Sequence, residues 1–147
     1  MRKKIVTLFI AVLLLCSIVS PGTFAATFED TEGKDCETAV ETLASMGIIK
    51  GKTEGIFAPD ANLTRAEAAA ILIRAMGIKD VTSVTDKYFT DVTEDHWAFH
   101  EIAMAYRLGF INGFDKNTFS PDRYVTDDQI VKMIVCVLGY GVQAESM

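Results

Sequence analysis

An internal repeat constrains this chain more than any other feature. Shifting the sequence by 62 residues produces eight identities in the 31 positions from 47 to 77. The identical pairs are Gly47 and Gly109, Ile49 and Ile111, Gly51 and Gly113, Phe57 and Phe119, Pro59 and Pro121, Asp60 and Asp122, Thr64 and Thr126, and Gly77 and Gly139. Upstream, the motif at Phe28 and Asp30 matches Phe89 and Asp91 with a shift of 61. Glycine, proline and aromatic positions fix backbone shape, so we predict a tandem duplication of one fold.

Each repeat is predicted to form a helix, a turn-rich loop and a second helix. Apolar residues recur at helical spacing in 35–46 and 98–108, and turn-forming residues fill the loops 51–62 and 113–124. The second helices, 64–76 and 126–138, begin with capping boxes that pair Thr64 with Glu67 and Thr126 with Gln129. The segments that follow these boxes, 68–76 and 130–138, are apolar on nearly every face apart from Arg74 and Lys132, which predicts buried helices. The expected fold class is all-α, with helix-loop-helix repeats packed into a helical bundle.

The first 25 residues have the pattern of an export signal. Three basic residues precede a 15-residue apolar run from Ile5 to Val19, which is too short for a permanent transmembrane helix. We place cleavage after Ala25, and a lipoprotein anchor at Cys16 is the rival interpretation. The predicted divisions are a signal peptide 1–25, a first repeat 26–86 and a second repeat 87–147. Cleavage removes three basic residues and no acidic ones, so the mature chain has a formal charge of 11 − 20 = −9.

Composition argues against several classes of function. A pI near 4.8 provides no basic surface for nucleic acid. The sequence contains no phosphate-binding glycine loop and no nucleophile elbow, and we predict neither an enzyme nor a bound cofactor. His96 and His100 are four residues apart, but no third ligand accompanies them, so no metal site is expected. Cys36 and Cys136 remain in the mature chain, and whether they form a disulfide stays open.

Two residues are candidates for ligand binding. Arg65 lies in the first turn of a predicted helix, where backbone N–H groups and a guanidinium together suit a carboxylate or a phosphate. The alternative is a surface arginine paired with a nearby acid. Trp97, the single tryptophan, is either a core anchor or a flat face for a sugar ring.

These motifs resemble S-layer homology repeats. In the second repeat the resemblance covers Phe89-Thr90-Asp91, His96-Trp97-Ala98, the segment Gly109 to Gly113, and Phe119-Ser120-Pro121-Asp122. In the first it covers Phe28 to Asp30, Gly47 to Gly51, Phe57 to Asp60, and Leu63-Thr64-Arg65-Ala66-Glu67. The resemblance implies an all-helical module, usually three repeats in a pseudo-threefold arrangement. It also implies non-covalent attachment of exported proteins to a secondary polysaccharide of the bacterial cell wall, often carrying pyruvate ketals.

The resemblance assigns roles to particular residues. Arg65 would pair with a ligand carboxylate, and Trp97 would stack on or shape the groove. Our own binding hypothesis adds Lys50 and Lys52, which we expect to contribute positive potential. The loop glycines Gly51, Gly55 and Gly113 match positions where the family backbone turns sharply or approaches sugar.

Departures from the family pattern leave a second hypothesis open. The first repeat has Lys34-Asp35-Cys36 in place of the motif around Trp97, and the second has Thr126-Asp127-Asp128-Gln129 in place of the arginine motif. A third repeat is missing, so the arrangement would be incomplete. We therefore expect a secreted, non-catalytic module at the cell wall or S-layer, with no membrane contact after cleavage, that binds an anionic, pyruvylated wall polymer. The alternative is an interaction piece that completes such an assembly with another chain or by self-association.

Overall fold

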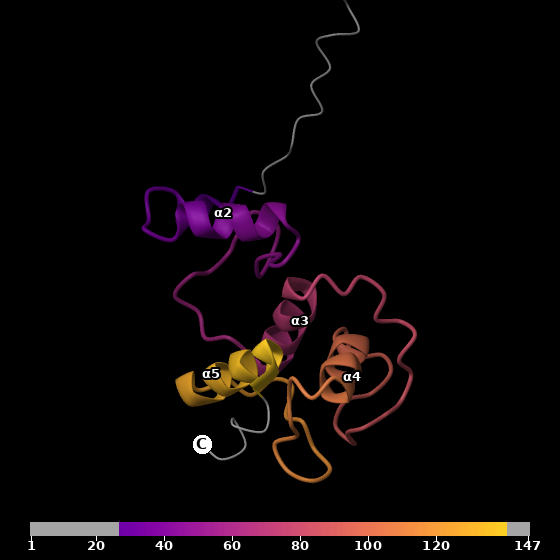
Figure 1. The fold of residues 1–147 in the computed structure, drawn as a ribbon. Helices are drawn as coiled ribbons and strands as arrows, with labels where there is room; N and C mark the ends of the chain where they lie inside the picture. Colours follow the sequence, from indigo (N-terminus) through magenta and orange to yellow (C-terminus); the bar gives the residue numbers. More distant parts are fainter. Residues whose placement is uncertain (1–26, 141–147) are drawn as a thin grey trace, which may run out of the picture.

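The chain folds into helices joined by long loops. The computed structural model describes residues 27–140, so the predicted signal peptide lies outside it (Figure 1). The four α-helices of this part are α2 (Glu37–Ser45), α3 (Arg65–Ala75), α4 (Phe99–Arg107) and α5 (Asp127–Val135). A 3-10 turn at Glu29–Thr31 precedes them and a π-helical turn at Cys136–Tyr140 follows. Within 27–140 the extended structure is limited to isolated bridges, which confirms the predicted all-α class. No helix of this part is long and apolar enough to cross a bilayer.

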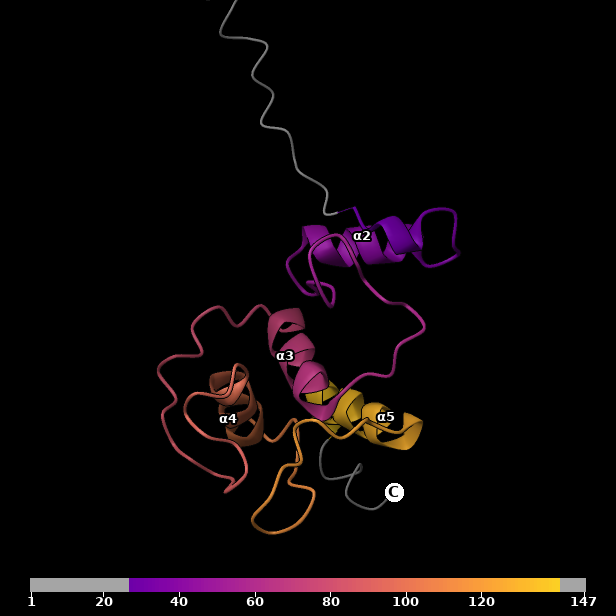
Figure 2. The ribbon, with the colours of Figure 1, turned by 180° about the vertical axis from the view of Figure 1, so that it is seen from behind.

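The main core joins the two repeats. Helix α3 of the first repeat packs along α4 of the second, and the two lie side by side in both views (Figures 1 and 2). Buried side chains from both helices share one cluster with Phe89, Phe119 and Met133. Helix α2 lies apart and packs in a smaller cluster of Phe28, Val40 and Ile49, which Ile71 of α3 borders. The packing unit therefore crosses the predicted repeat boundary. The pseudo-threefold arrangement stays a prediction.

The two predicted capping boxes have different outcomes. At α3 the box is complete, because Thr64 accepts a hydrogen bond from the Glu67 N–H and Glu67 accepts one from the Thr64 N–H. At α5 only the threonine half forms, with 3.4 Å between Thr126 Oγ1 and the Gln129 nitrogen. The buried Oε1 of Gln129 has no hydrogen-bond partner within the described residues. The prediction of a capping box at Gln129 is therefore only half correct.

The prediction of two buried second helices holds for α3 and is wrong for α5. Ala69 and Leu72 of α3 are 0% and 7% exposed, whereas their counterparts Val131 and Ile134 in α5 are 48% and 45% exposed. Only one side of α5 faces the core. Its residues Ile130 and Met133 pack there, together with Val137 directly after the helix. The segment 130–138 is apolar apart from Lys132, but the described structure supplies packing for one face of it only.

One carboxylate in each repeat holds a loop in an unusual conformation. Asp30 accepts hydrogen bonds from the N–H groups of Phe57 and Ala58, at 2.9 and 2.6 Å. Ala58 has a φ of 59°, a left-handed conformation that costs an alanine about 1–2 kcal/mol. Asp91 makes the matching bonds in the second repeat, where Ser120 has a φ of 58°. The aspartates of the two Phe-x-Asp motifs thus hold these loops in place, and we call Asp30 and Asp91 the aspartate clamps.

The Asp30 clamp should make stability pH-dependent. The hydrogen bond from the Phe57 N–H is the main cause that lowers the pKa of Asp30 below its ordinary value of 3.8. A lowered folded-state pKa gives stability that is present above 3.8 and is lost as the pH falls through the lower value. Asp30→Asn should lower the melting temperature at neutral pH and reduce its fall on acidification. Thermal unfolding followed by circular dichroism between neutral pH and about pH 2 tests this.

The matched control is Asp60→Asn. The Asp60 carboxylate is exposed and makes one surface ion pair with Lys34, so this variant should melt close to the wild type. Equal melting temperatures for the Asp30 variant and the wild type at neutral pH would contradict the clamp.

Candidate binding grooves

A groove of about 660 Å³ runs between the first repeat and the start of α4. One wall is the loop from Ile49 to Lys52, and the floor is the side of α3 that carries Glu67, Ile71 and Arg74. The opposite wall comes from the second repeat, which contributes Trp97 and Glu101. The groove thus depends on the packing of α3 against α4.

Trp97 is a surface residue on the wall of this first groove. Its side chain is 57% exposed, which excludes the core interpretation. The indole stacks beside the His96 ring with 5.8 Å between ring centroids. His96 Nδ1 accepts the Ala98 N–H at 3.1 Å, which fixes the turn that presents the indole. A flat aromatic face is therefore available to a ligand in the groove.

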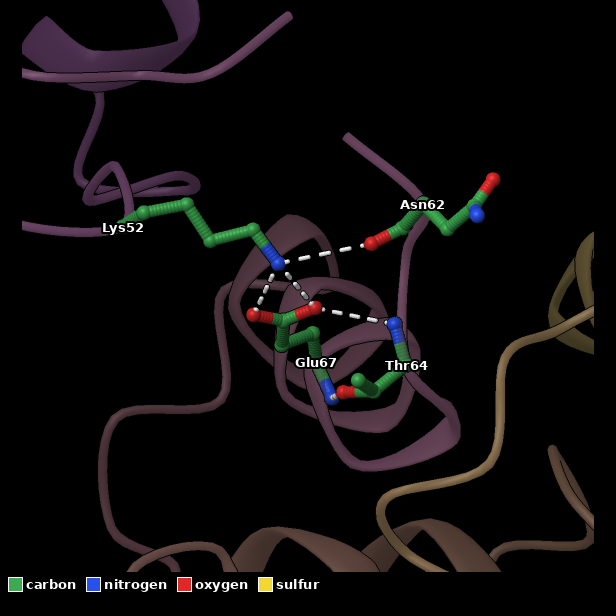
Figure 3. Close-up of polar contacts among 4 residues, drawn as sticks. All are labelled: Lys52, Asn62, Thr64 and Glu67. Carbon is green, nitrogen blue, oxygen red and sulfur yellow. Dashed lines mark hydrogen bonds and ion pairs between the residues drawn. The ribbon is translucent and has the colours of Figure 1, made fainter. Parts of the chain in front are cut away.

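Lys52 and Glu67 form the polar centre of the first groove (Figure 3). Lys52 Nζ lies 2.5 and 2.7 Å from the two carboxylate oxygens of Glu67. Glu67 also accepts the Thr64 N–H at 2.8 Å, so one carboxylate both caps α3 and holds the lysine. Burial raises the pKa of Glu67, but the bonds from Lys52 and Thr64 outweigh it and the net pKa is lowered.

The charges of the first groove are largely balanced. Arg74 Nη2 lies 3.7 Å from Glu101 Oε1, an ion pair that links α3 to α4. With Lys52 held by Glu67, two of the three cations lining the groove are paired, and Lys50 makes no ion pair within the described residues. The basic patch predicted at Lys50 and Lys52 is therefore weaker than the sequence alone indicates.

A second, smaller groove of about 220 Å³ is the repeat-related copy of the first. Its wall, Ile111 to Phe114, is the counterpart of Ile49 to Lys52 at the shift of 62. Its helix face, with Gln129, Met133 and Cys136, is the counterpart of Glu67, Ile71 and Arg74. Arg65 and Lys132 line it, and none of its lining residues is acidic.

Arg65 is buried between the repeats and is 4% exposed. Its Nε and Nη2 donate to the carbonyl oxygens of Phe119 and Asn112, at 2.8 and 2.9 Å, and its guanidinium lies over the Phe119 ring. Burial is the main cause that lowers the pKa of Arg65. The N–H groups of Arg65 and Ala66 donate to carbonyls of Arg123 and Pro121. The sequence suggested the N-terminus of α3 as an anion-binding site. Its N–H groups at Arg65 and Ala66 are instead already bonded to the loop of the second repeat.

The predicted site residues divide between the two grooves. Gly51, Lys52 and Trp97 line the first groove, Arg65 and Gly113 line the second, and Gly55 lines neither. The structure therefore does not bring Arg65 and Trp97 into one composite site. Their separation follows from the direction of the Arg65 side chain, which points into the second repeat.

The glycines of both grooves are required by the backbone. A Cβ on Gly51, whose φ is 76°, would approach the Ile56 carbonyl oxygen to 2.7 Å. A Cβ on Gly113 would collide with the Asp115 carbonyl oxygen. These two positions accept only glycine, whatever contact they make with a ligand.

Sequence reasoning missed Arg74 and Glu101 as groove residues. The available signal was Arg74 itself, the single charge within the otherwise apolar stretch 68–76. The two histidines serve the backbone: His96 caps the turn, and His100 Nδ1 lies 2.9 Å from the Val84 carbonyl oxygen. No group of three potential metal ligands occurs in residues 27–140, and Cys36 and Cys136 are free thiols.

The chain belongs to the S-layer homology domain family. The family model matches residues 27–69 and 88–126, which together are more than half of the chain. The chain is 32% identical over 143 residues to a surface layer protein of Brevibacillus choshinensis, covering 94% of this chain and 13% of that protein. It is 31% identical over 145 residues to a middle cell wall protein of Brevibacillus brevis, covering 94% of this chain and 14% of that protein. No solved structure matches it.

One of the similar proteins is named as an enzyme. An amylopullulanase of Thermoanaerobacterium thermosulfurigenes is 34% identical over 104 residues, covering 71% of this chain and 5% of that protein. The chain thus spans only a small part of each of these relatives. The family and the surface-protein relatives give this chain a location at the cell surface.

We expect the loss of the Arg65 side chain to lower the stability of the fold, whether or not it also affects ligand binding. Arg65→Ala leaves two carbonyl oxygens in the repeat interface without their donor, and we expect it to lower the free energy of unfolding by about 2–4 kcal/mol. Urea unfolding followed by circular dichroism measures the loss.

The matched control is Arg123→Ala, which removes a stacking contact of an exposed arginine on Phe114. It should cost less than about 1 kcal/mol. An Arg65 variant as stable as the Arg123 variant would show that the inter-repeat bonds contribute little.

Proposed function

We propose that this chain is a non-catalytic module that attaches to the bacterial cell wall by binding an acidic secondary wall polysaccharide in the first groove. The observation that carries the proposal is the exposed indole of Trp97 on the wall of a groove that also holds Lys50, Lys52 and Arg74. The family, the surface-layer and cell-wall relatives and the relative with an enzyme name all support a wall-attachment role.

The residues of the first groove suit a charged sugar. The indole offers an apolar face on which the C–H groups of a pyranose ring can stack. The exposed Lys50 is a donor for a carboxylate such as that of a pyruvate ketal. A ligand carboxylate near Lys52 would compete with Glu67, which limits how much binding energy this lysine supplies.

The second groove offers a subsidiary contact for the same polymer. Arg65 and Lys132 line it without an acidic neighbour among its lining residues, and Ile111 and Met133 add an apolar surface. Arg65 retains N–H donors beyond the two that bond to Asn112 and Phe119. A carboxylate that carries a methyl group, as a pyruvate ketal does, would find both kinds of contact there.

Binding to isolated walls tests the proposal. The chain should co-sediment with bacterial sacculi that carry their secondary polymer and not with sacculi from which it has been extracted. Trp97→Ala should weaken binding about tenfold, which corresponds to the loss of about 1.4 kcal/mol of stacking. Tyr124→Ala is the matched control, because Tyr124 is 58% exposed and lies outside the first groove. Equal binding with and without the polymer would overturn the proposal.

The salt dependence of binding should be shallow. The cations of the first groove are mostly paired within the protein, and the mature chain's charge of −9 repels an anionic polymer at long range. Salt screens this repulsion together with the local attraction, so the two effects offset one another. Co-sedimentation over a salt titration measures the slope, and a steep loss of binding would contradict a mainly stacking-based contact.

A further inference from the structure

The contact between α3 and α4 is an interface between the first and the second repeat of the chain. It buries apolar side chains of both helices in one core cluster, and the Arg74–Glu101 ion pair crosses it. Helix α5 is the repeat counterpart of α3, and α2 is the counterpart of α4. Each of these outer helices therefore carries a copy of a surface that is covered in the α3–α4 pair.

On α2 the copied surface is exposed. Glu101, Ala105 and Leu108 follow one another along one side of α4. Ala105 is fully buried there, whereas Leu108 at the end of the row stays 43% exposed. Their counterparts on α2 are Ala39, Leu43 and Met46, all of which are exposed in the described structure. A row of apolar side chains along one helix face, open to solvent, is a typical feature of an interaction surface.

On α5 the copied surface is also open. The counterpart of Arg74 is Cys136, directly after α5, and the neighbouring Val131 and Ile134 are about half exposed. The two members of the α3–α4 ion pair thus have apolar counterparts on both outer helices: Cys136 for arginine and Ala39 for glutamate. A single replacement would bury one charge without its partner, whereas the paired replacement leaves two apolar residues at the position of the ion pair. Lys132, the counterpart of the buried Ala70, remains a charge on the α5 side.

We propose that a second copy of this chain packs its α2 on α5, reproducing between chains the contact that α3 makes with α4 within one chain. Cys136 of one copy would then face Ala39 of the next. The contact joins different surfaces of the two molecules, so it produces a closed ring or an extended assembly. The charge of −9 on each mature chain opposes association, and added salt should therefore strengthen it.

Sedimentation velocity of the mature chain, with and without added salt, tests this contact. The wild type should show a mass that rises above the monomer with protein concentration, and salt should increase it. Ala39→Glu and Cys136→Arg should each weaken association, because each places one unpaired charge in the contact. The double variant Ala39→Glu/Cys136→Arg should recover association, since it introduces the ion pair of the α3–α4 contact.

Two controls make the test specific. Ala39→Arg/Cys136→Arg carries like charges and should stay monomeric. Met76→Glu alters an exposed methionine at the end of α3, outside both surfaces, and should associate like the wild type. Circular dichroism establishes that each variant is folded. A folded wild type that is monomeric at its highest soluble concentration, or a double variant that does not recover association, would overturn the proposal.

Discussion

The arrangement of the molecule depends on one buried guanidinium. Arg65 extends from the first turn of α3 into the second repeat, where carbonyl oxygens of Asn112 and Phe119 accept its N–H groups. Next to it the N–H groups of Arg65 and Ala66 bond to carbonyls of the loop before α5. A buried charge must have hydrogen-bond partners, so these contacts fix the start of α3 against the second repeat. Once α3 is fixed it packs along α4, and that packing forms the first groove.

Duplication explains the shared parts of the structure, and divergence explains the different chemistry of its two grooves. Both repeats use an aspartate clamp on a left-handed loop residue and a glycine, Gly51 or Gly113, at the start of the loop. The grooves built on this common frame carry different side chains. In the first, Glu67 and Glu101 balance Lys52 and Arg74, whereas in the second Gln129 and Cys136 take the places of Glu67 and Arg74. Trp97 belongs to the first groove only, because the first repeat has Asp35 at the corresponding position.

Much of the fold could be predicted from local sequence signals. The capping box at Thr64 and Glu67 is a contact over three residues, and it forms as predicted. The same pattern at Thr126 and Gln129 forms only in part, because Gln129 lines the second groove and its buried Oε1 has no hydrogen-bond partner among residues 27–140. The burial of α3 and the exposure of α5 were not separated from the segments 68–76 and 130–138, since each of these is apolar apart from one cation, Arg74 or Lys132. The difference lies in what packs on each helix, which a local pattern does not contain.

The sequence by itself determined the family, the duplication, the helical class and the main turn positions, because each is encoded by residue type at fixed spacing. It also identified Arg65 and Trp97 as unusual residues. Only the tertiary structure decided their surroundings: Arg65 is held by backbone groups about 50 positions away, and Trp97 stands on a groove wall built from both repeats. The physical reason is that hydrogen bonding and burial are properties of neighbours in space. Those neighbours were brought together by the packing of α3 on α4, which no single repeat specifies.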